Sequence, residues 1–286
     1  MSPGRSALIF SEQTSSDVFI ERAGASDGSL PRIMAAVVTH IHDIIKELRP
    51  SREDWQKLIE FLTEVGHASD ERRQEWVLLS DLIGASALVE EINSRRPKGA
   101  TPNTIRGPFY RSDAPARAAG ANISFDGIGE PLAVSGRVTD LDGLPVANAE
   151  VVTWQANAYG VYENQQPDMQ PEHNLRGVFR TDANGSFHYQ TVVPAGYGVP
   201  GDGPVGHLLA RAGYPLHRPA HIHFLVRAEG FETITTHIFD GSDPHLGEDA
   251  LFGVKPELIR VFEPAEEGRK VEFTFVMVRA KPGRSA

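Results

Sequence analysis

Hydrophobic residues follow two different periods along this chain, and the period changes near residue 98. From Leu30 to about Asn93 they recur at intervals of three and four, which is typical of amphipathic helices. Pro50 ends the first helical stretch, and Ser51 with Asp54 three residues later forms a capping box for the next. The pattern predicts about three helices, too few to enclose a core of their own. We expect their apolar faces to pack on the rest of the chain or in a homodimer.

Beyond the basic, proline-containing linker at residues 95–99 the period becomes two. Residues 132–138 alternate, residues 140–143 supply a turn, and residues 145–154 return as the second strand of a hairpin. Further strands are expected at residues 178–181, 185–193, 220–227, 233–239 and 271–278. Antiparallel strands without interleaved helices predict a mainly β protein, an antiparallel β-sandwich at residues 99–286 with a helical region at residues 1–98. Residues 194–217 are too rich in glycine and proline for a strand, and a loop of that length is usually functional.

Composition narrows the functional classes. Hydrophobic residues make up 40% of the 286 residues, enough for a buried core. The chain has no cysteine, so any metal must be held by nitrogen and oxygen ligands. A net charge of −10 argues against a nucleic-acid partner. No apolar run approaches the roughly 20 residues of a membrane span, and the start lacks the build of a secretory signal. We expect a cytoplasmic protein whose first 29 residues are loosely ordered.

The strongest local candidate for a metal site is His221-Ile222-His223, within the strand expected at residues 220–227. Residues two apart on a strand point to the same face, about 7 Å apart along the backbone, so two imidazoles can converge on one ion. The chain contains a comparison, His40-Ile41-His42, in the first helical stretch. There the helical period turns the two rings about 200° apart, so they cannot bind one ion together.

Two histidines do not complete a site, and the chain leaves two kinds of further ligand open. A carboxylate would suit the two-His-one-carboxylate site of Fe(II) oxygenases, but the first acid after His223 is Glu229, out of step for a cupin. Tyrosine is the other choice, because a phenol loses its proton only to a strong Lewis acid such as Fe(III). Tyr162 and Tyr197 stand in glycine-bearing segments, but each alone is better explained as a half-buried ring at a turn than as a ligand.

A set of short motifs, taken together, resembles the intradiol ring-cleavage dioxygenases, the catechol and hydroxyquinol 1,2-dioxygenases. The motifs follow the order and spacing of that family over about residues 75–260. They are Gly107-Pro108-Phe109-Tyr110, Trp154-Gln155-Ala156-Asn157, Tyr162, Pro194-x-Gly196-Tyr197-Gly198, Asp202-Gly203-Pro204-x-Gly206 and Arg218-Pro219-Ala220-His221-Ile222-His223-Phe224. The helical region, residues 1–98, also looks like the dimerisation segment of that family, which holds a lipid in some members.

The resemblance implies a ferric, non-haem iron centre with Tyr162, Tyr197, His221 and His223 as ligands, and an aromatic diol and O2 as substrates. In the family scheme the substrate displaces one tyrosinate, here Tyr197, which then accepts a proton from a substrate hydroxyl. Ring cleavage between the two hydroxyls gives a muconate. No flavin or nicotinamide is needed, and the chain has no glycine-rich dinucleotide fingerprint.

Two further residues are implied to take part. Arg218 matches the family arginine thought to stabilise negative charge on the ring, a role that suits a fixed guanidinium in a dry pocket. His237 stands where catechol-cleaving members usually have glutamine, and the later Phe252-Gly253-Val254-Lys255 also looks more like hydroxyquinol-cleaving members. We therefore expect hydroxyquinol (benzene-1,2,4-triol) as substrate, with catechol or a substituted catechol as the alternative, and His237 as an acid, base or hydrogen bonder.

The family's substrate wall matches one set of positions in this chain. These are Leu78, Asp81, Ile105, Arg106, Gly107, Pro108, Phe109, Val199, Pro200 and Arg218. The carboxylate of Asp81 can accept a hydrogen bond from a third ring hydroxyl, although it can equally cap a helix turn. Arg106 stands where the family commonly has an apolar residue, so a substrate with an acidic ring substituent is a further alternative.

Two hypotheses of other classes compete with a dioxygenase. A non-catalytic transthyretin-like module fits the pattern at residues 136–154, and it predicts ligand binding without metal. A zinc hydrolase using the His-x-His pair predicts stoichiometric zinc and no iron. Purified dioxygenase should instead be burgundy, from charge transfer between tyrosinate and iron.

Overall fold

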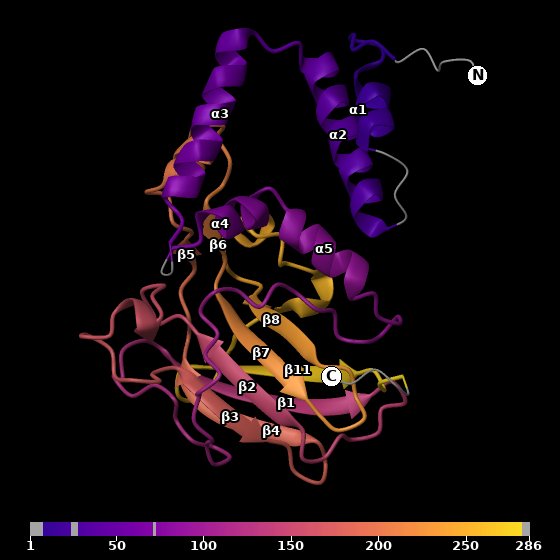
Figure 1. Cartoon of the computed structure of the whole chain (residues 1–286). Coiled ribbons are helices and arrows are strands. Elements are labelled where there is room, and N and C mark those ends of the chain that lie inside the picture. Colours follow the sequence, from indigo (N-terminus) through magenta and orange to yellow (C-terminus); the bar gives the residue numbers. More distant parts are fainter. Residues whose placement is uncertain (1–7, 24–27, 71–72, 282–286) are drawn as a thin grey trace. The chain divides into compact units, whose positions relative to one another are not determined.

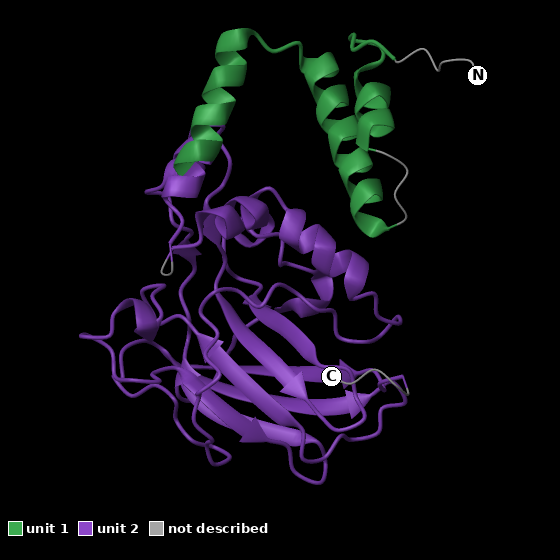
Figure 2. Ribbon diagram, in the orientation of Figure 1, with its two compact units in different colours: residues 1–64 green, residues 65–286 purple. Residues whose placement is uncertain are grey.

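The computed structural model describes residues 8–23, 28–70 and 73–281, which form two compact units (Figure 2). Residues 1–64 make up unit 1 and residues 65–286 unit 2, and each is described by itself. Residues 1–29 were expected to be loosely ordered. Residues 1–7 and 24–27 of that stretch lie outside the described residues, but Ser15–Ala23 form helix α1. No helix in the described ranges combines the length and apolarity needed to cross a membrane.

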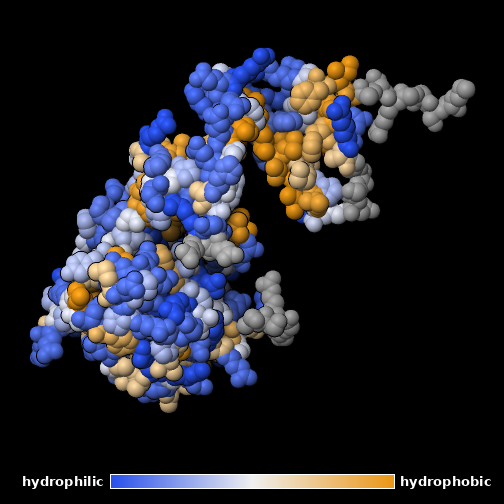
Figure 3. All heavy atoms as spheres, turned by 60° about the vertical axis from the view of Figure 1, so that its left-hand side comes forward, coloured by the Kyte–Doolittle hydropathy of each residue, from blue (hydrophilic) through white to orange (hydrophobic). Residues whose placement is uncertain are grey.

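Unit 1 contains α1, α2 (Ser29–Leu48) and most of α3 (Arg52–His67), and α1 packs on α2. Arg49 ends α2 in the left-handed conformation ahead of Pro50. The predicted capping box is confirmed, because the Asp54 backbone N–H donates to Ser51 Oγ and the Ser51 backbone N–H donates to Asp54. No residue of α2 is buried, and its apolar stripe lies on the surface of the chain (Figure 3).

Unit 2 starts with two further helices, α4 (Glu75–Leu82) and α5 (Ala85–Asn93), where the sequence pattern indicated one segment. Gly84 separates them with a φ of 77°, a conformation that favours glycine. A third helix, α6 (Pro204–Arg211), lies in the region predicted to be a loop, and Pro204 at its first turn is pre-set for a helix start. Short 3₁₀ helices lie elsewhere in unit 2, at η1 (Glu163–Gln165), η2 (Leu246–Glu248) and η3 (Pro256–Leu258).

The rest of unit 2 confirms the predicted β-sandwich (Figure 1). One sheet has the order β10 (Glu263–Pro264), β11 (Arg269–Met277), β1 (Pro131–Asp140), β4 (Ser186–Val192). The other has the order β3 (Arg176–Arg180), β2 (Glu150–Gln155), β7 (His221–Arg227), β8 (Ile234–Asp240), β9 (Ile259–Arg260). The short strands β5 (Tyr197–Gly198) and β6 (His217–Arg218) pair with each other in a separate two-stranded antiparallel sheet.

The predicted hairpin at residues 132–154 is wrong. The chain does turn after β1, where Asp140 N–H donates to the Leu144 carbonyl. However, β1 pairs with β4 and β11, whereas β2 pairs with β3 and β7 in the other sheet. Two pairs, β1 with β11 and β8 with β9, are parallel, so the sandwich is mixed rather than purely antiparallel. Local alternation indicates a strand but does not name its partner.

The hydrophobic core lies between the two sheets and determines which face of β7 is free for chemistry. Ile222, Phe224 and Val226 of β7 belong to this core, together with Val134 of β1 and Phe275 of β11. Because side chains alternate along a strand, the intervening residues of β7 point to the opposite face. That face is also buried, since only the last residue of β7 is exposed. The candidate functional site is built there.

Candidate metal centre

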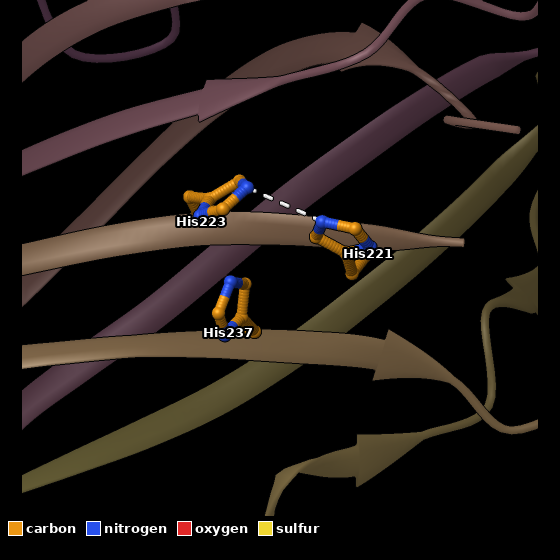
Figure 4. Close-up of side chains that lie close together, drawn as sticks. All are labelled: His221, His223 and His237. Atoms are coloured by element: carbon orange, nitrogen blue, oxygen red, sulfur yellow. Dashed lines mark hydrogen bonds between the residues drawn. The ribbon is translucent and has the colours of Figure 1, made fainter. Parts of the chain in front are cut away.

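His221 and His223 lie on the face of β7 that points away from the sandwich core. Their Nε2 atoms are 3.2 Å apart, and both side chains are 2% exposed (Figure 4). The geometry predicted for a His-x-His pair on a strand is therefore confirmed. His40 and His42 stand on helix α2, as expected for the pair that cannot converge.

Two phenols complete a group of four donor atoms. Tyr162 Oη is 3.0 Å from His223 Nε2 and 3.4 Å from Tyr197 Oη. Tyr162 is fully buried, and its backbone N–H donates to Gln165 Oε1 in the 3₁₀ turn that follows it. Tyr197 is only half-buried, on the two-residue strand β5. The structure thus brings together the four residues that the sequence analysis grouped as ligands.

Gly160 permits the two tyrosines to approach each other. It has a φ of 78°, and a Cβ at this position would lie 2.8 Å from the Gly196 carbonyl oxygen and 2.8 Å from Tyr197 Cβ. Any side chain here would push the Tyr162 and Tyr197 segments apart. The preceding turn is held by Asn157, whose Oδ1 accepts from the backbone N–H groups of Tyr159 and Val161.

The arrangement fits a metal ion held by nitrogen and oxygen. Donor atoms about 2 Å from a common ion lie about 3 Å from one another, which matches the observed separations. His221 Nδ1 lies 2.6 Å from the Pro219 carbonyl oxygen, so this nitrogen donates its proton and leaves Nε2 free to bind metal. Burial lowers the pKa of both His221 and His223, so both stay neutral, as a ligand must be. Burial also raises the pKa of Tyr162 far above its usual value, so a phenolate there requires a strong Lewis acid beside it.

A third histidine joins the cluster through the sheet register. Arg176, Trp154, His223 and His237 stand directly opposite one another on β3, β2, β7 and β8. Trp154 stacks on the His223 ring at 4.6 Å, and a nitrogen of each histidine lies within 4.8 Å of the others (Figure 4).

His237 is oriented by a residue that the sequence analysis missed. Its Nδ1 is 2.5 Å from Thr104 Oγ1, and its Nε2 is buried with no hydrogen-bond partner within the described part of the chain. Thr104 lies outside the motifs, and only the fold places it against β8, where its backbone N–H donates to the Thr235 carbonyl. The free Nε2 is available to a ligand that enters the site.

Arg218 lies beside the cluster and is fixed by Asp249. Arg218 Nε is 3.0 Å from Asp249 Oδ1, and Nη1 is 3.4 Å from His221 Nε2. Burial opposes both charges, but their mutual attraction outweighs it, so the pKa of Asp249 is lowered and that of Arg218 is raised. Arg218 therefore keeps a permanent positive charge at the site. Asp249 was not predicted, because it stands 31 residues away with no local signal.

The residues expected in the substrate wall differ in their burial and in their contacts with the metal-site cluster. Phe109 stacks on Tyr162 at 4.2 Å, and a Cβ on Gly107 would lie 3.5 Å from His223. Asp81 is 7% exposed; burial raises its pKa, and the Ser86 hydroxyl and then the Arg218 charge act against this rise. Val199 is buried, Leu78 and Ile105 are half-buried, and Arg106, Pro108 and Pro200 are exposed, with Arg106 lying over the Tyr110 ring.

Comparison with known proteins decides the family. Residues 29–101 match the family model described as catechol dioxygenase N terminus, and residues 105–279 match the model described as dioxygenase. This chain belongs to the intradiol ring-cleavage dioxygenase family. Membership favours the dioxygenase hypothesis over the transthyretin-like module and the zinc hydrolase.

Relatives within the intradiol dioxygenases cover nearly the whole chain. A hydroxyquinol 1,2-dioxygenase of Rhizobium sp. (strain MTP-10005) is 47% identical over 92% of this chain and 90% of its own length. The crystal structure of hydroxyquinol 1,2-dioxygenase from Pseudomonas putida DLL-E4 has a TM-score of 0.91 at 39% identity, covering 94% of this chain and 99% of that one. Catechol 1,2-dioxygenase from Acinetobacter sp. ADP1 is more distant, with a TM-score of 0.79 at 27% identity over 96% of each chain.

Proposed function

We propose that this intradiol dioxygenase cleaves hydroxyquinol between adjacent hydroxyls, using ferric iron held by Tyr162, Tyr197, His221 and His223. The observation that carries the proposal is the convergence of two phenols and two neutral imidazoles in one buried cluster. Two phenolates stabilise Fe(III) over divalent ions, and the chain has no thiol to compete with them. Ferric iron bound there would take up the deprotonated diol and make its ring reactive toward O2.

The protein groups around the iron site have separable tasks. Tyr197, half-buried between Gly196 and Gly198, is the more accessible phenol, and its Oη would accept a proton from a substrate hydroxyl. Arg218 offers a fixed positive charge to the ring, because Asp249 holds its guanidinium in place. His237 presents its free Nε2 to the same space as a hydrogen-bonding group.

The choice of hydroxyquinol over catechol rests on Asp81. Its carboxylate is buried beside Ser86, and a third ring hydroxyl can donate a further hydrogen bond to it, which plain catechol cannot. The relatives named as hydroxyquinol 1,2-dioxygenases, at 47% and 39% identity, support this choice.

Oxygen uptake with hydroxyquinol, catechol and chlorocatechols, measured side by side, tests the substrate. We expect the highest kcat/KM for hydroxyquinol, and a higher value for catechol would contradict the proposal. Metal analysis and the visible spectrum test the iron centre. We expect a burgundy protein with one iron per chain, and a protein that stays colourless after iron loading would refute the ligand set.

We also propose that residues 1–98 carry the contact between two copies of the chain. Its support is the apolar stripe of α2, formed by Leu30, Ile33, Met34, Val37, Ile41, Ile44 and Leu48, all at least 41% exposed. Sedimentation should show a dimer that Ile41→Lys converts to a monomer, with Glu60→Lys on α3 as the control. Mass spectrometry of an organic extract tests whether a lipid is bound there.

A further inference from the structure

Glu75, the first residue of α4, is a fully buried carboxylate at the start of α6. Its Oε1 accepts the Val205 backbone N–H at 3.1 Å. The N-cap residue of α6, Gly203, has no side chain to do this. Glu75 thus supplies, from another helix, the acceptor and the negative charge that the N-terminus of α6 lacks.

Arg73 extends this contact to the loop before α6. Its Nε donates to Glu75 Oε2 at 2.7 Å, while Nη1 and Nη2 donate to the two oxygens of Asp202 at 2.9 and 3.0 Å. Asp202 is 75% exposed, so solvent screens its ion pair with Arg73. The Glu75 side chain is completely excluded from water, so removal of Arg73 would leave its buried carboxylate without a charged partner. Arg73 itself is 33% exposed and keeps Asp202 as a second partner.

The backbone around Glu75 leaves no room for adjustment. A Cβ on Gly203 would overlap Arg73 Nη2 and Glu75 Oε1, and it would lie 2.9 Å from Glu75 Cδ. A Cβ on Gly206 would lie 2.5 Å from Gly201 Cα. The loop between Tyr197 and α6 is therefore packed directly against the Arg73–Glu75 pair, with no side chain between them.

The network connects the two halves of the proposed substrate pocket. Helix α4, which begins at Glu75, carries Asp81 two turns later. The segment held by Arg73 and Glu75 carries Tyr197 and Val199. Tyr197 approaches His221, with ring centres 5.5 Å apart, so this segment reaches the metal cluster.

We propose that Glu75 and Arg73 are positioning residues that set the distance between the Tyr197 segment and Asp81, and so the placement of a ring that contacts both. The expected effect on kcat/KM rests on the proposed function, whereas the expected effect on the order of residues 197–206 does not. The buried Glu75 carboxylate costs desolvation energy, and its two directional contacts, with Arg73 and with the Val205 N–H, fix the geometry around it. Because misplacement of a substrate by about 1 Å can cost on the order of a hundredfold in rate, the pair acts on catalysis without touching the substrate.

Glu75→Gln tests the pair with little change of shape, since it retains an acceptor for Val205 but removes the charge facing Arg73. Gly203→Ala is a second variant, which separates the loop from the pair without altering either charge. Glu263→Gln is the control, because it removes one side of an exposed ion pair with Lys270 in the same unit. Hydrogen exchange of the iron-free chain is the first measurement, and iron content and kinetics with hydroxyquinol and catechol are the second.

Both test variants should speed exchange at residues 197–206 about tenfold or more, while β1, β7 and β11 exchange as in the wild type. Iron content should be retained, and kcat/KM for hydroxyquinol should fall about tenfold to a hundredfold, more than for catechol. Unchanged exchange at residues 197–206, or an equal increase throughout the sandwich, would overturn the inference, as would kinetics equal to the control. If the wild type cleaves no diol, the proposed function fails, and the exchange measurement alone still decides whether the pair holds the loop.

Discussion

Arg218 and Asp249, 31 residues apart in the chain, form an ion pair in which both side chains are at most 3% exposed. Asp249 also accepts the backbone N–H groups of Leu251 and Gly253, so one carboxylate holds both the arginine and the turn beside it. A Cβ on Gly253 would lie 2.9 Å from Asp249 Oδ2 and 3.1 Å from Arg218 Nη2. The position of the guanidinium is thus determined by a residue outside every motif that suggested its role.

Replacing Asp249 with alanine should lower the free energy of unfolding by about 3 kcal/mol, because Arg218 is left as an unpaired buried charge. The activity should fall with it, since the guanidinium loses its fixed orientation. Urea denaturation of the iron-free protein measures the first effect. Asp168→Ala, an exposed carboxylate, is the control, and a loss for Asp249→Ala no larger than for this control would contradict the assignment.

The same pair predicts a dependence of stability on pH. The pKa of Asp249 is lower in the folded chain than the unfolded value of about 3.9, because the Arg218 charge outweighs the effect of burial. The stability contributed by the Asp249 charge is therefore complete above about pH 4 and is lost as the pH falls through the lowered pKa. The difference in unfolding free energy between the wild type and Asp249→Asn should be constant from about pH 5 to pH 8 and shrink below about pH 4. A difference that grows on acidification would reverse this sign and refute the pairing.

The two His-x-His pairs provide a matched test of the metal centre. His221→Ala removes a donor whose Nε2 lies 3.2 Å from that of His223, so iron affinity should fall more than about a hundredfold and the colour should disappear. His40→Ala changes the same residue type in the same sequence pattern, but on α2. It should leave the iron affinity and the colour unchanged. Iron titration followed in the visible spectrum measures the difference. Equal iron affinity in the two variants would show that His221 is not a ligand.

Asp81 should control the choice between a triol and a diol. Asp81→Asn replaces the buried carboxylate by a weaker acceptor, so the preference for hydroxyquinol over catechol should drop about tenfold or more. Iron content should not change, because none of the four proposed ligands is altered. Steady-state kinetics with both substrates give the ratio, with Asp168→Asn as the control. A ratio that stays at the wild-type value would remove Asp81 from the recognition of the third hydroxyl.

Several features of this protein could be predicted from the sequence because their physical causes are local. Alternation along residues 221–227 places two imidazoles on one face of a strand, and the helical period around His40 excludes the same outcome there. The capping box at Ser51 depends on neighbours three residues apart, and the motifs that resemble the family are equally short. The ligand roles of the tyrosines rested on the resemblance alone, since a phenol at a turn has no local signature.

The tertiary structure decided what depends on contacts between distant segments. The turn after β1 does not show that β1 and β2 enter different sheets, because hydrogen bonding between strands has no local code. Asp249, Thr104 and Glu75 reach Arg218, His237 and Val205 over 31, 133 and 130 residues, and each is an ordinary polar residue until folding buries it. The sequence by itself determined the strand on which His221 and His223 share a face and the chemistry that this pair favours. Only the packing of loops and helices around that strand determined which charges and hydrogen bonds orient the site, since burial makes those interactions strong.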